Sequence, residues 1–416
     1  MGIFKTYINP FDVDGTYTSF TEVTKDTIRA SLTDISQDVD SSDYELGVFR
    51  FANIQLRFNN KSGRFSDIET FQSIFRYRRS DSQVKITYRI QDGPQCGTVK
   101  CGMVEAKLAA EVVLFKGLVN DESYSTDVKQ QNVQVRVLGF ESLLSRVTVP
   151  FASLSNGMLV STAIYAMLNQ TPLNDLMNIE LANIVPDLDQ AIDSVASFQN
   201  KTVKEAMDKL LLASNSVLYV DKERAFGDIF VNDTVYVKSR AATIAVQAQF
   251  FGQASNEGAE NIVNIANLKN GVSRVFNYVT WRGTTLLKTD SDSVTRYGVR
   301  KVELDLAFFT DNTKRNNILQ AVVDEFSTAK QEFQITVPLT YASLDLTILD
   351  RISVDYPTVY IAGENEIPIC GVFLWEVGVL PEALWTLTID SADGYKIIGK
   401  KINVQNQTIA FKVRKI

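Results

Sequence analysis

The residue types and spacing best suited to chemistry lie in one stretch past the middle of the chain, DSDSVTRYGVRK, residues 290–301. Asp290 and Asp292 match the first and third ligands of a calcium-binding loop. The sixth position of that loop is Thr295 where glycine is required, and the twelfth is Lys301 where a bidentate glutamate is required. A lysine in place of the charge-balancing carboxylate argues against an EF-hand, so we predict no metal site here.

The same stretch is better explained as a turn that leads into a strand. Asp and Ser side chains accept hydrogen bonds from their own neighbouring backbone, which favours a turn at residues 290–293. Gly298 then allows the chain to enter a strand over residues 299–308. On this interpretation the stretch serves packing and assembly.

A second motif, GYKIIGK at residues 394–400, has the glycine and lysine spacing of a phosphate-binding loop. The next residue is Lys401, whereas such a loop needs a hydroxyl group to hold magnesium. The central pair Ile397 and Ile398 is typical of a strand. The segment therefore predicts half of a β-hairpin, and we predict no cofactor for the chain.

The absence of histidine from all 416 residues removes most enzyme classes. It excludes Ser-His-Asp and Cys-His nucleophile systems, histidine-ligated zinc and the commonest general base at neutral pH. We therefore predict that the chain is not an enzyme. A glycosidase stays open as an alternative, because sequence alone cannot place two carboxylates about 5 to 9 Å apart across a cleft.

Charge and composition restrict the partners further. The net charge of −7 argues against a protein held to nucleic acid by phosphate contacts. No apolar run approaches the roughly 18 residues that a membrane helix needs, so we predict no membrane span. The three cysteines, Cys96, Cys101 and Cys370, imply no disulfide framework. A bridge between Cys96 and Cys101 stays open, although two free thiols in a reducing compartment are favoured.

The elements that must position these residues alternate between strand-rich and helix-rich parts. Apolar and polar residues alternate at residues 54–58, 84–90 and 133–137, as in half-buried antiparallel strands. Thr202 and Glu205 form a capping box before an apolar stripe at helical spacing. A further helix is expected to start near residue 313, and the chain after residue 334 is again strand-like.

These patterns predict a mainly β fold with an α+β insert: two similar β-barrel domains together with smaller mixed α/β domains. The expected domains are residues 1–147 for the first barrel, 148–255 for a mixed helical domain, 256–333 for an α+β segment bearing the opening stretch, and 334–416 for the strands of the second barrel.

Three parts of the chain carry a resemblance to a known family. The first is the strand Val113–Val119 and the strand that ends at Gly139; the second is the helix after Thr202 that leads into the strand at residues 217–220. The third is the stretch at residues 290–298 with the later strand pair at residues 346–354. The signature residues are Phe115, Gly117, Gly139, Asp290, Ser293, Tyr297, Gly298 and Asp350. Their order resembles the tail-hub, or baseplate hub, proteins of tailed bacteriophages.

The resemblance implies a structural role in a virion tail. Such hubs are homotrimers in which each subunit carries two similar barrels, so that a ring of six barrels continues the sixfold tail tube. The implied partners are further copies of the chain, tail tube and distal tail ring proteins, the tape measure protein, and a central fibre or other tip protein. DNA would pass through the lumen without specific binding, and assembly would take place in the host cytoplasm.

Two other functions stay open beside the structural role. One is a tail-tip enzyme that cuts polysaccharide or cell wall with a carboxylate pair, and the other is a module that binds a host receptor. The receptor of such a module would be a sugar or a protein on the host surface.

Overall fold

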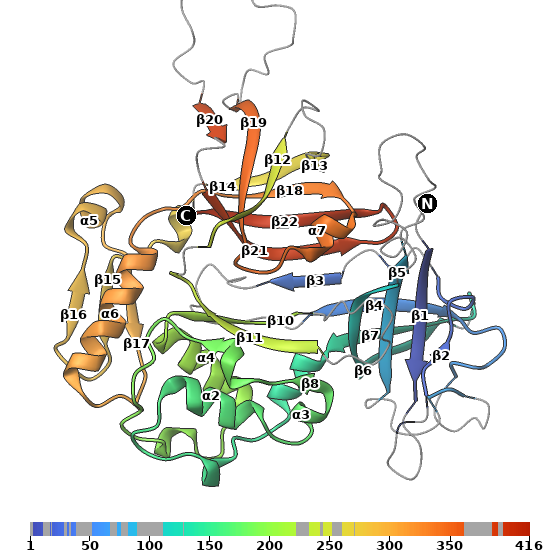
Figure 1. Cartoon of the computed structure of the whole chain (residues 1–416), viewed down its shortest axis with the longest axis horizontal. Helices are drawn as coiled ribbons and strands as arrows, with labels where there is room; N and C mark the ends of the chain where they lie inside the picture. Colours follow the sequence, from blue (N-terminus) through green and yellow to red (C-terminus); the bar gives the residue numbers. More distant parts are fainter. Residues whose placement is uncertain are drawn as a thin grey trace, which may run out of the picture.

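The computed structural model describes residues 3–10, 17, 19–28, 31–32, 35–38, 52–66, 73–75, 82–89, 111–127, 129–221, 233–241, 244–251, 260–269, 271–361, 385–389 and 394–416. The three cysteines lie outside these residues. Figure 1 shows strand-rich parts at the two ends of the sequence, a helical central region, and a separate inserted segment that contains α5 and α6.

The first strand-rich part is a sheet whose inward positions are apolar. Its strands are β1 (Ile3–Asn9), β2 (Thr21–Glu22), β3 (Ile35–Asp38), β4 (Asn53–Asn59), β5 (Gln83–Arg89), β6 (Val112–Asp127) and β7 (Asn132–Gly139). In β4, Ile54, Leu56 and Phe58 are fully buried while Gln55 and Arg57 between them are exposed. Alternation with period 2 therefore gave the correct inward face.

The strand order in this sheet is β4-β7-β6-β5-β1-β2. One segment, residues 21–28, spans from β1 to β4. The N–H of Val23 donates to the carbonyl of Thr6 in β1 at 2.8 Å, and the N–H of Ile28 donates to the carbonyl of Arg57 in β4 at 2.8 Å. The segment thus contacts β1 and β4, the two ends of the run β4-β7-β6-β5-β1.

Within the described residues, the second strand-rich part has eight strands and a short helix that lies before its longest strand. Its elements are β12 (Val246–Phe251), β13 (Glu260–Asn261), β14 (Asn264–Lys269), β18 (Glu332–Pro338), α7 (Tyr341–Asp345), β19 (Arg351–Ile361), β20 (Trp385–Ile389), β21 (Gly394–Asn403) and β22 (Thr408–Lys415). The hairpin predicted at residues 394–400 is confirmed, because β21 pairs antiparallel with β22 along its length.

The two strand-rich parts share one pairing scheme. In the first, the neighbours run β1-β5-β6-β7-β4, and in the second they run β12-β19-β21-β22-β18. Residues 260–269 occupy the position in the second part that residues 21–28 occupy in the first. β13 pairs with β12, and β14 pairs with β18. One difference is direction: β1 is antiparallel to its neighbours, whereas β12 is parallel to β13 and β19.

The pairing of the described strands does not show two separate closed barrels. β3 pairs with β21 over four residues, and Ser36 of β3 also pairs with Asn53 of β4. The two parts are thereby joined into one 15-stranded sheet. The prediction of a mainly β fold with mixed α/β parts is confirmed, while closure of each half into a barrel is not.

The central region begins directly after β7 and carries most of the helices. Its elements are η3 (Phe140–Ser145), η4 (Phe151–Ser153), α2 (Val160–Leu168), α3 (Leu173–Leu176), β8 (Met177–Asn178), η5 (Leu181–Asn183), β9 (Ile184–Val185), η6 (Ala196–Phe198), α4 (Val203–Ala213), β10 (Ser216–Asp221) and β11 (Asp233–Ser239). The predicted capping box is confirmed: Thr202 accepts from the N–H of Glu205, and Glu205 accepts from the N–H of Thr202.

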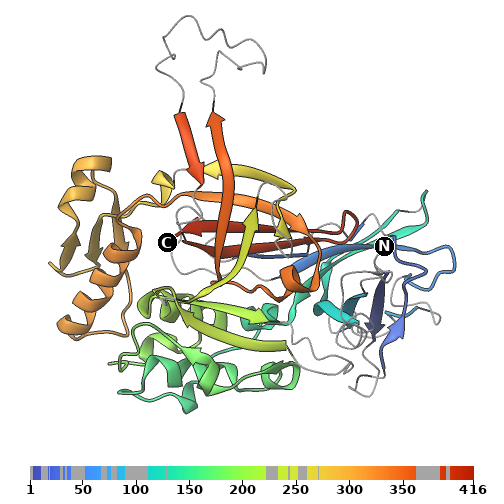
Figure 2. The ribbon, with the colours of Figure 1, turned by 45° about the horizontal axis from the view of Figure 1, so that its top comes forward.

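The inserted segment lies between β14 and β18. It consists of η7 (Val272–Arg274), β15 (Tyr278–Trp281), β16 (Leu287–Thr289), α5 (Ser291–Tyr297), β17 (Lys301–Leu304) and α6 (Asn312–Phe326). The predicted helix near residue 313 is confirmed; Asp311 caps it by accepting from the N–H groups of Thr313 and Lys314. Figure 2 shows the insert set apart from the sheets, and β19 and β20 projecting from the body as a ribbon.

The described residues form two apolar cores, and each core combines parts of the chain that are far apart in the sequence. One core is filled from both strand-rich parts, for example by Phe115 and Phe411. The other combines the central region and the insert, for example Leu210 with Trp281 and Leu319. The insert therefore packs on the central region. None of the helices in the described ranges is long and apolar enough to cross a membrane.

Candidate functional site

Three of the predicted signature residues meet where β6 lies against β7. Gly117 pairs directly with Gly139 across the two strands. A Cβ atom on Gly117 would overlap the carbonyl oxygen of Leu138, so only glycine fits the observed approach. Phe115, two residues earlier, is fully buried in the core of the sheets. The arrangement fixes how the two strands pack.

Glu141, which sequence analysis did not single out, explains the second glycine. Its side chain is buried, and its Oε1 accepts from the N–H of Ala52 at 2.5 Å. The carbonyl of Ala52 in turn accepts from the N–H of Gly139 at 2.7 Å. A Cβ atom on Gly139 would overlap the Glu141 carboxylate. A glutamate two residues after a glycine at the end of a strand is a common pattern. The sequence therefore could not predict that Glu141 contacts Ala52.

The turn predicted at residues 290–293 is wrong: residues 291–297 form helix α5. The expected side-chain bond is present, since Asp290 accepts from the N–H of Ser293 at 3.0 Å, but it caps a helix. Gly298 has φ +72° and ends the helix. The following strand is also shorter than predicted, covering Lys301–Leu304 instead of residues 299–308. An aspartate that bonds two or three residues ahead fits either structure, so the local signal was ambiguous.

Ser293 belongs to a buried polar network that holds α5 in place. Its hydroxyl donates to the carbonyl of Ser327 and accepts from Nδ2 of Asn277 at 3.1 Å. Asn277, which is fully buried, also donates to the carbonyl of Gly298 at 2.9 Å and accepts from the N–H of Arg300 at 2.8 Å. The network connects the helix to β15 and to the end of α6.

The remaining signature residues lie in two further places. Tyr297 is half-buried at the end of α5, and the guanidinium group of Arg296 lies 5.3 Å from the centre of its ring. Asp350 stabilises the turn before β19, where its carboxylate accepts from the N–H of Thr347 at 2.7 Å. The structure therefore distributes the eight residues over separate contacts and does not gather them into one site.

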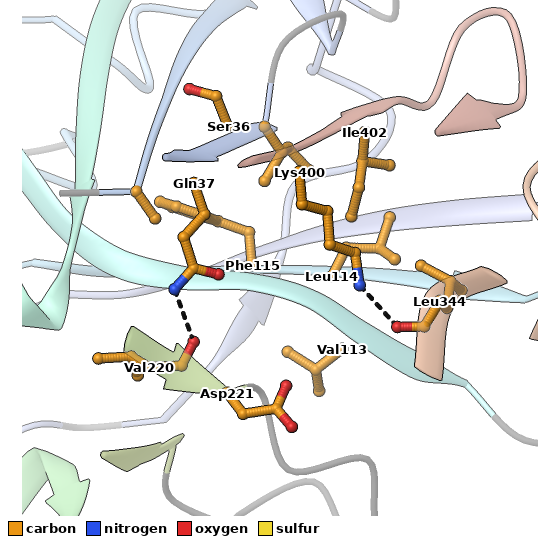
Figure 3. A pocket seen from close by; sticks show the side chains of 12 residues that line it. Ser36, Gln37, Val113, Leu114, Phe115, Val220, Asp221, Leu344, Lys400 and Ile402 are labelled. Atoms are coloured by element: carbon orange, nitrogen blue, oxygen red, sulfur yellow. Dashed lines mark hydrogen bonds between the residues drawn. The ribbon is translucent and has the colours of Figure 1, made fainter. Parts of the chain in front are cut away.

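A small cavity marks the place where the two strand-rich parts meet the central region (Figure 3). Its volume is about 40 Å³. Its lining comes from β3, β6, β10, β21 and α7, elements far apart in the sequence. Phe115 lines it, and Figure 3 shows Asp221 and Lys400 beside it.

The polar groups at this cavity bond to backbone carbonyls. Nε2 of Gln37 donates to the carbonyl of Val220 at 3.1 Å. Nζ of Lys400 donates to the carbonyls of Leu344 and Leu346, at 2.6 and 2.8 Å. These bonds connect β3 to β10 and β21 to α7. A cavity of this size holds a few water molecules, whereas small-molecule sites occupy about 300 to 1,000 Å³.

Other cavities of the described residues are also small. One of about 270 Å³ lies between β12 and α7, and one of about 140 Å³ lies at the start of β21. Within the ranges that the structure describes, no group of three or more Cys, Asp or Glu side chains is arranged to hold a metal ion. The geometry at the junction is thus that of a structural contact between three parts of the chain.

The fold has counterparts among solved structures. The 43 kDa tail protein of prophage MuSo2 from Shewanella oneidensis aligns with a TM-score of 0.50 and 11% identity, covering 99% of this chain and 97% of that one. The chain has the fold of a phage tail protein. The predicted resemblance to such proteins is confirmed at the level of the fold.

Two other solved structures are also similar to the chain. The tail protein from Neisseria meningitidis MC58 has a TM-score of 0.49 and 11% identity, covering 99% of this chain and 96% of that one. A component of the type VI secretion system of Escherichia coli has a TM-score of 0.42 and 9% identity, covering 87% and 69%. No protein-family model and no curated protein sequence matches the chain.

Proposed function

We propose that the chain is a structural hub protein at the tip of a phage tail. The observation that carries this proposal is the pairing scheme shared by the two strand-rich parts. Three copies of a chain with two similar strand-rich parts would present six such parts around a threefold axis. Such a ring would match a sixfold tube on one side and a threefold tip on the other.

Each strand-rich part is proposed to be a barrel whose seam is bridged by one short segment. Residues 21–28 bridge β1 and β4 in the first part, and residues 260–269 bridge β12 and β18 in the second. Closure of this kind would leave few open strand edges, which protects a tube-like protein from uncontrolled edge pairing.

The ribbon of β19 and β20 is proposed as one contact with a neighbour in the ring. Beyond the sheet, Val359 pairs with Leu387 and Ile361 pairs with Trp385. Figures 1 and 2 show this ribbon projecting away from the body of the molecule. A two-stranded ribbon is marginally stable alone in water, so contact with another chain would stabilise it.

Among the described residues, the three cavities named above fall below the usual volume of a substrate site, which favours a role in assembly. The proposed partners are further copies of the chain, the tail tube and distal tail ring proteins, the tape measure protein, and a central fibre or other tip protein. The net charge of −7 suits a protein that lines a lumen through which DNA slides without specific binding. The proposed location is the virion tail, after assembly in the host cytoplasm.

Light scattering after size-exclusion chromatography tests the ring. The expected mass is three times the 46.5 kDa of one chain. Immunogold electron microscopy of phage particles should then place the label at the tail tip. A stable monomer at micromolar concentration, together with label elsewhere on the particle, would contradict the proposal. Clearing of host cell wall by the purified chain would instead favour the carboxylate enzyme.

A further inference from the structure

The two strand-rich parts share their order along the chain as well as their pairing. In the first part the chain runs from β1 through residues 21–28 and β3 to β4, and then through β5 and β6 to β7. In the second part it runs from β12 through residues 260–269 and the insert to β18, and then through β19 and β21 to β22. The insert therefore occupies the place in the second part that β3 occupies in the first, and β6 corresponds to β21.

β3 is the strand that joins its own part to the other part. β19 pairs with one edge of β21 as far as Lys396, and β22 takes the opposite edge. After a register shift between Ile397 and Gly399, β3 pairs antiparallel with residues 399–402 of β21. β3 thus continues along the edge of β21 that β19 leaves.

β6 has the same arrangement up to this point. β5 pairs with one edge of β6 as far as Leu118, and the pairing of the other edge with β7 shifts register between Asn120 and Ser125. Ser125, Thr126 and Asp127 then continue along β7 and are exposed. Among the strands that the structure describes, none pairs with the other edge of these three residues. β6 therefore has an edge at the place where β21 accepts β3.

The insert carries an open strand edge of similar length. β16 is the edge strand of the sheet β16-β15-β17. The carbonyl of Leu286 accepts from the N–H of Trp281 in β15 at 3.2 Å, so by alternation Lys288 also bonds towards β15. Leu287 and Thr289 direct their backbone groups away from β15. Leu287 is 40% exposed and carries no charge that would protect this edge.

The opposite edge of the insert sheet is less suited to a partner strand. The carbonyl of Leu304 in β17 accepts from the N–H of Arg282 at 2.9 Å, so Lys301 and Glu303 direct their backbone groups outwards. Both of these side chains are exposed and charged. Charged residues on an edge strand, lysine above all, discourage pairing with another chain. β16 is therefore the edge of the insert that favours a partner.

The insert also lies on the side of the molecule where a neighbour would stand. Figures 1 and 2 show the insert and the first strand-rich part on opposite sides of the second strand-rich part. In a closed ring of identical copies, every contact is between one surface of a copy and a different surface of the next. The side of the second part that carries the insert would then face the first part of the next copy.

We propose that the insert of each copy contacts the first strand-rich part of the next copy, with β16 added to the edge of β6 at residues 125–127. The partner is a second copy of this chain, and the contact repeats between copies what β3 does within one copy. This inference rests on the ring proposed above and adds which segments join its subunits.

A proline at position 287 tests the strand contact. Leu287→Pro removes an N–H that points away from β15, so the insert keeps its own hydrogen bonds. In light scattering over a dilution series, this variant should raise the concentration of half-dissociation of the trimer roughly tenfold or more, because every contact in the ring loses a hydrogen bond. Lys301→Pro removes an outward N–H from the opposite edge and is the matched control. It should leave that concentration unchanged, and circular dichroism should show that both variants keep the fold.

Disulfide cross-linking gives a second measurement that does not depend on how well a proline variant folds. The background is a chain whose three native cysteines are replaced by serine. Leu287→Cys together with Thr126→Cys should give covalent dimers and trimers on a denaturing gel after oxidation, because a disulfide needs Cα atoms within about 7 Å. Lys301→Cys together with Thr126→Cys is the control and should remain monomeric on the gel.

The outcomes separate this contact from the ring itself. A wild type that remains a monomer throughout the dilution series would overturn both. A trimeric wild type would leave the ring standing, and the contact alone would be overturned by any of three results. These are unchanged dissociation of Leu287→Pro without cross-linking of the 126 and 287 pair, equal weakening by Leu287→Pro and Lys301→Pro, and covalent dimers formed by Leu287→Cys alone, which would place two β16 edges together.

Discussion

The carboxylate of Asp193 in the central region forms an ion pair with the ammonium group of Lys314 in α6. The same carboxylate accepts from the N–H groups of Thr310 and Asp311, at 2.7 and 2.8 Å. Asp193 therefore satisfies backbone donors at the start of α6 as well as a side-chain cation. This contact joins the insert to the region on which it packs.

Acid should weaken that contact. Burial raises the pKa of Asp193, but the bonds from Lys314, Asp311 and Thr310 outweigh it and lower the pKa to about 2, from 3.8. The stability is fully present above pH 4 and is lost as pH falls from about 4 to 2. Asp193→Asn should lower the free energy of unfolding by about 2 kcal/mol at pH 7 and by much less near pH 2, measured by urea denaturation.

Asp305→Asn is the matched control for this experiment. Asp305 forms an ion pair with Arg282 at 2.9 Å, but both side chains are more than half exposed. Exposed pairs of this kind contribute little, so a change within about 0.5 kcal/mol is expected. Equal losses for the two variants would contradict a special role for Asp193.

Lys85 should lower the stability of the first sheet at neutral pH. It is fully buried in β5, with Nζ 4.8 Å from the ring centre of Tyr7 and 4.3 Å from that of Phe20. Burial, and then repulsion from Lys116, lower the pKa of Lys85 to about 8 against the attraction of Glu111. Its folded-state pKa is below the unfolded value of 10.5, so stability should rise as pH increases from about 8 to 10.5.

Replacement of Lys85 by methionine tests this directly. Lys85→Met should raise the free energy of unfolding by about 1 to 3 kcal/mol at pH 7, and the gain should shrink near pH 10. Thermal denaturation at both pH values measures it. A loss of stability at pH 7 would mean that the aromatic contacts outweigh the burial of the charge.

Close packing of β6 on β7 should make Gly117 intolerant of a side chain. Gly117→Ala is expected to cost about 2 to 3 kcal/mol, because the new Cβ must displace the Leu138 carbonyl. Gly157→Ala is the comparison: its φ is +85°, but nothing lies within 4 Å of the added Cβ. Its cost should be nearer 1 kcal/mol, from backbone strain alone. Similar costs in chemical denaturation would show that the strands can separate slightly.

The cap of α5 should depend on Asp290 and not on Asp292. Asp290→Ala removes the bond to the N–H of Ser293 and should cost about 1 kcal/mol. Asp292 is exposed in the first turn, so Asp292→Asn should change stability by less than about 0.5 kcal/mol. Hydrogen exchange of the α5 amides would measure the difference, and equal exchange would contradict the cap.

Substitution of Gly298 should lower the stability of the fold because of the backbone conformation at this position. With φ +72° and open space around it, Gly298→Val should destabilise through strain, by about 2 kcal/mol, without a clash. Gly298→Asn should be milder, because asparagine is not branched at Cβ, but a substantial cost should remain, since ψ 176° lies outside the left-handed region that asparagine adopts. Thermal melting of both variants tests this, and equal melting temperatures would count against the explanation.

Local patterns in the sequence determined the elements whose signals are short-range. The alternation at residues 54–58 specified the inward face of β4, and the Thr202 and Glu205 pair specified the start of α4, because both depend on neighbours a few residues away. The hairpin of β21 and β22 and the mainly β character were predictable for the same reason. The absence of histidine restricted the chemistry before any fold was known.

Tertiary structure decided the features that depend on distant partners. Residues 291–297 form a helix whose Ser293 is held by Asn277 and Ser327, and no local pattern contains those contacts. The equivalence of residues 21–28 with residues 260–269 likewise appears only through strand pairing. The cavity of about 40 Å³ gathers Gln37, Val220 and Lys400 from β3, β10 and β21, so only the folded chain brings these groups together.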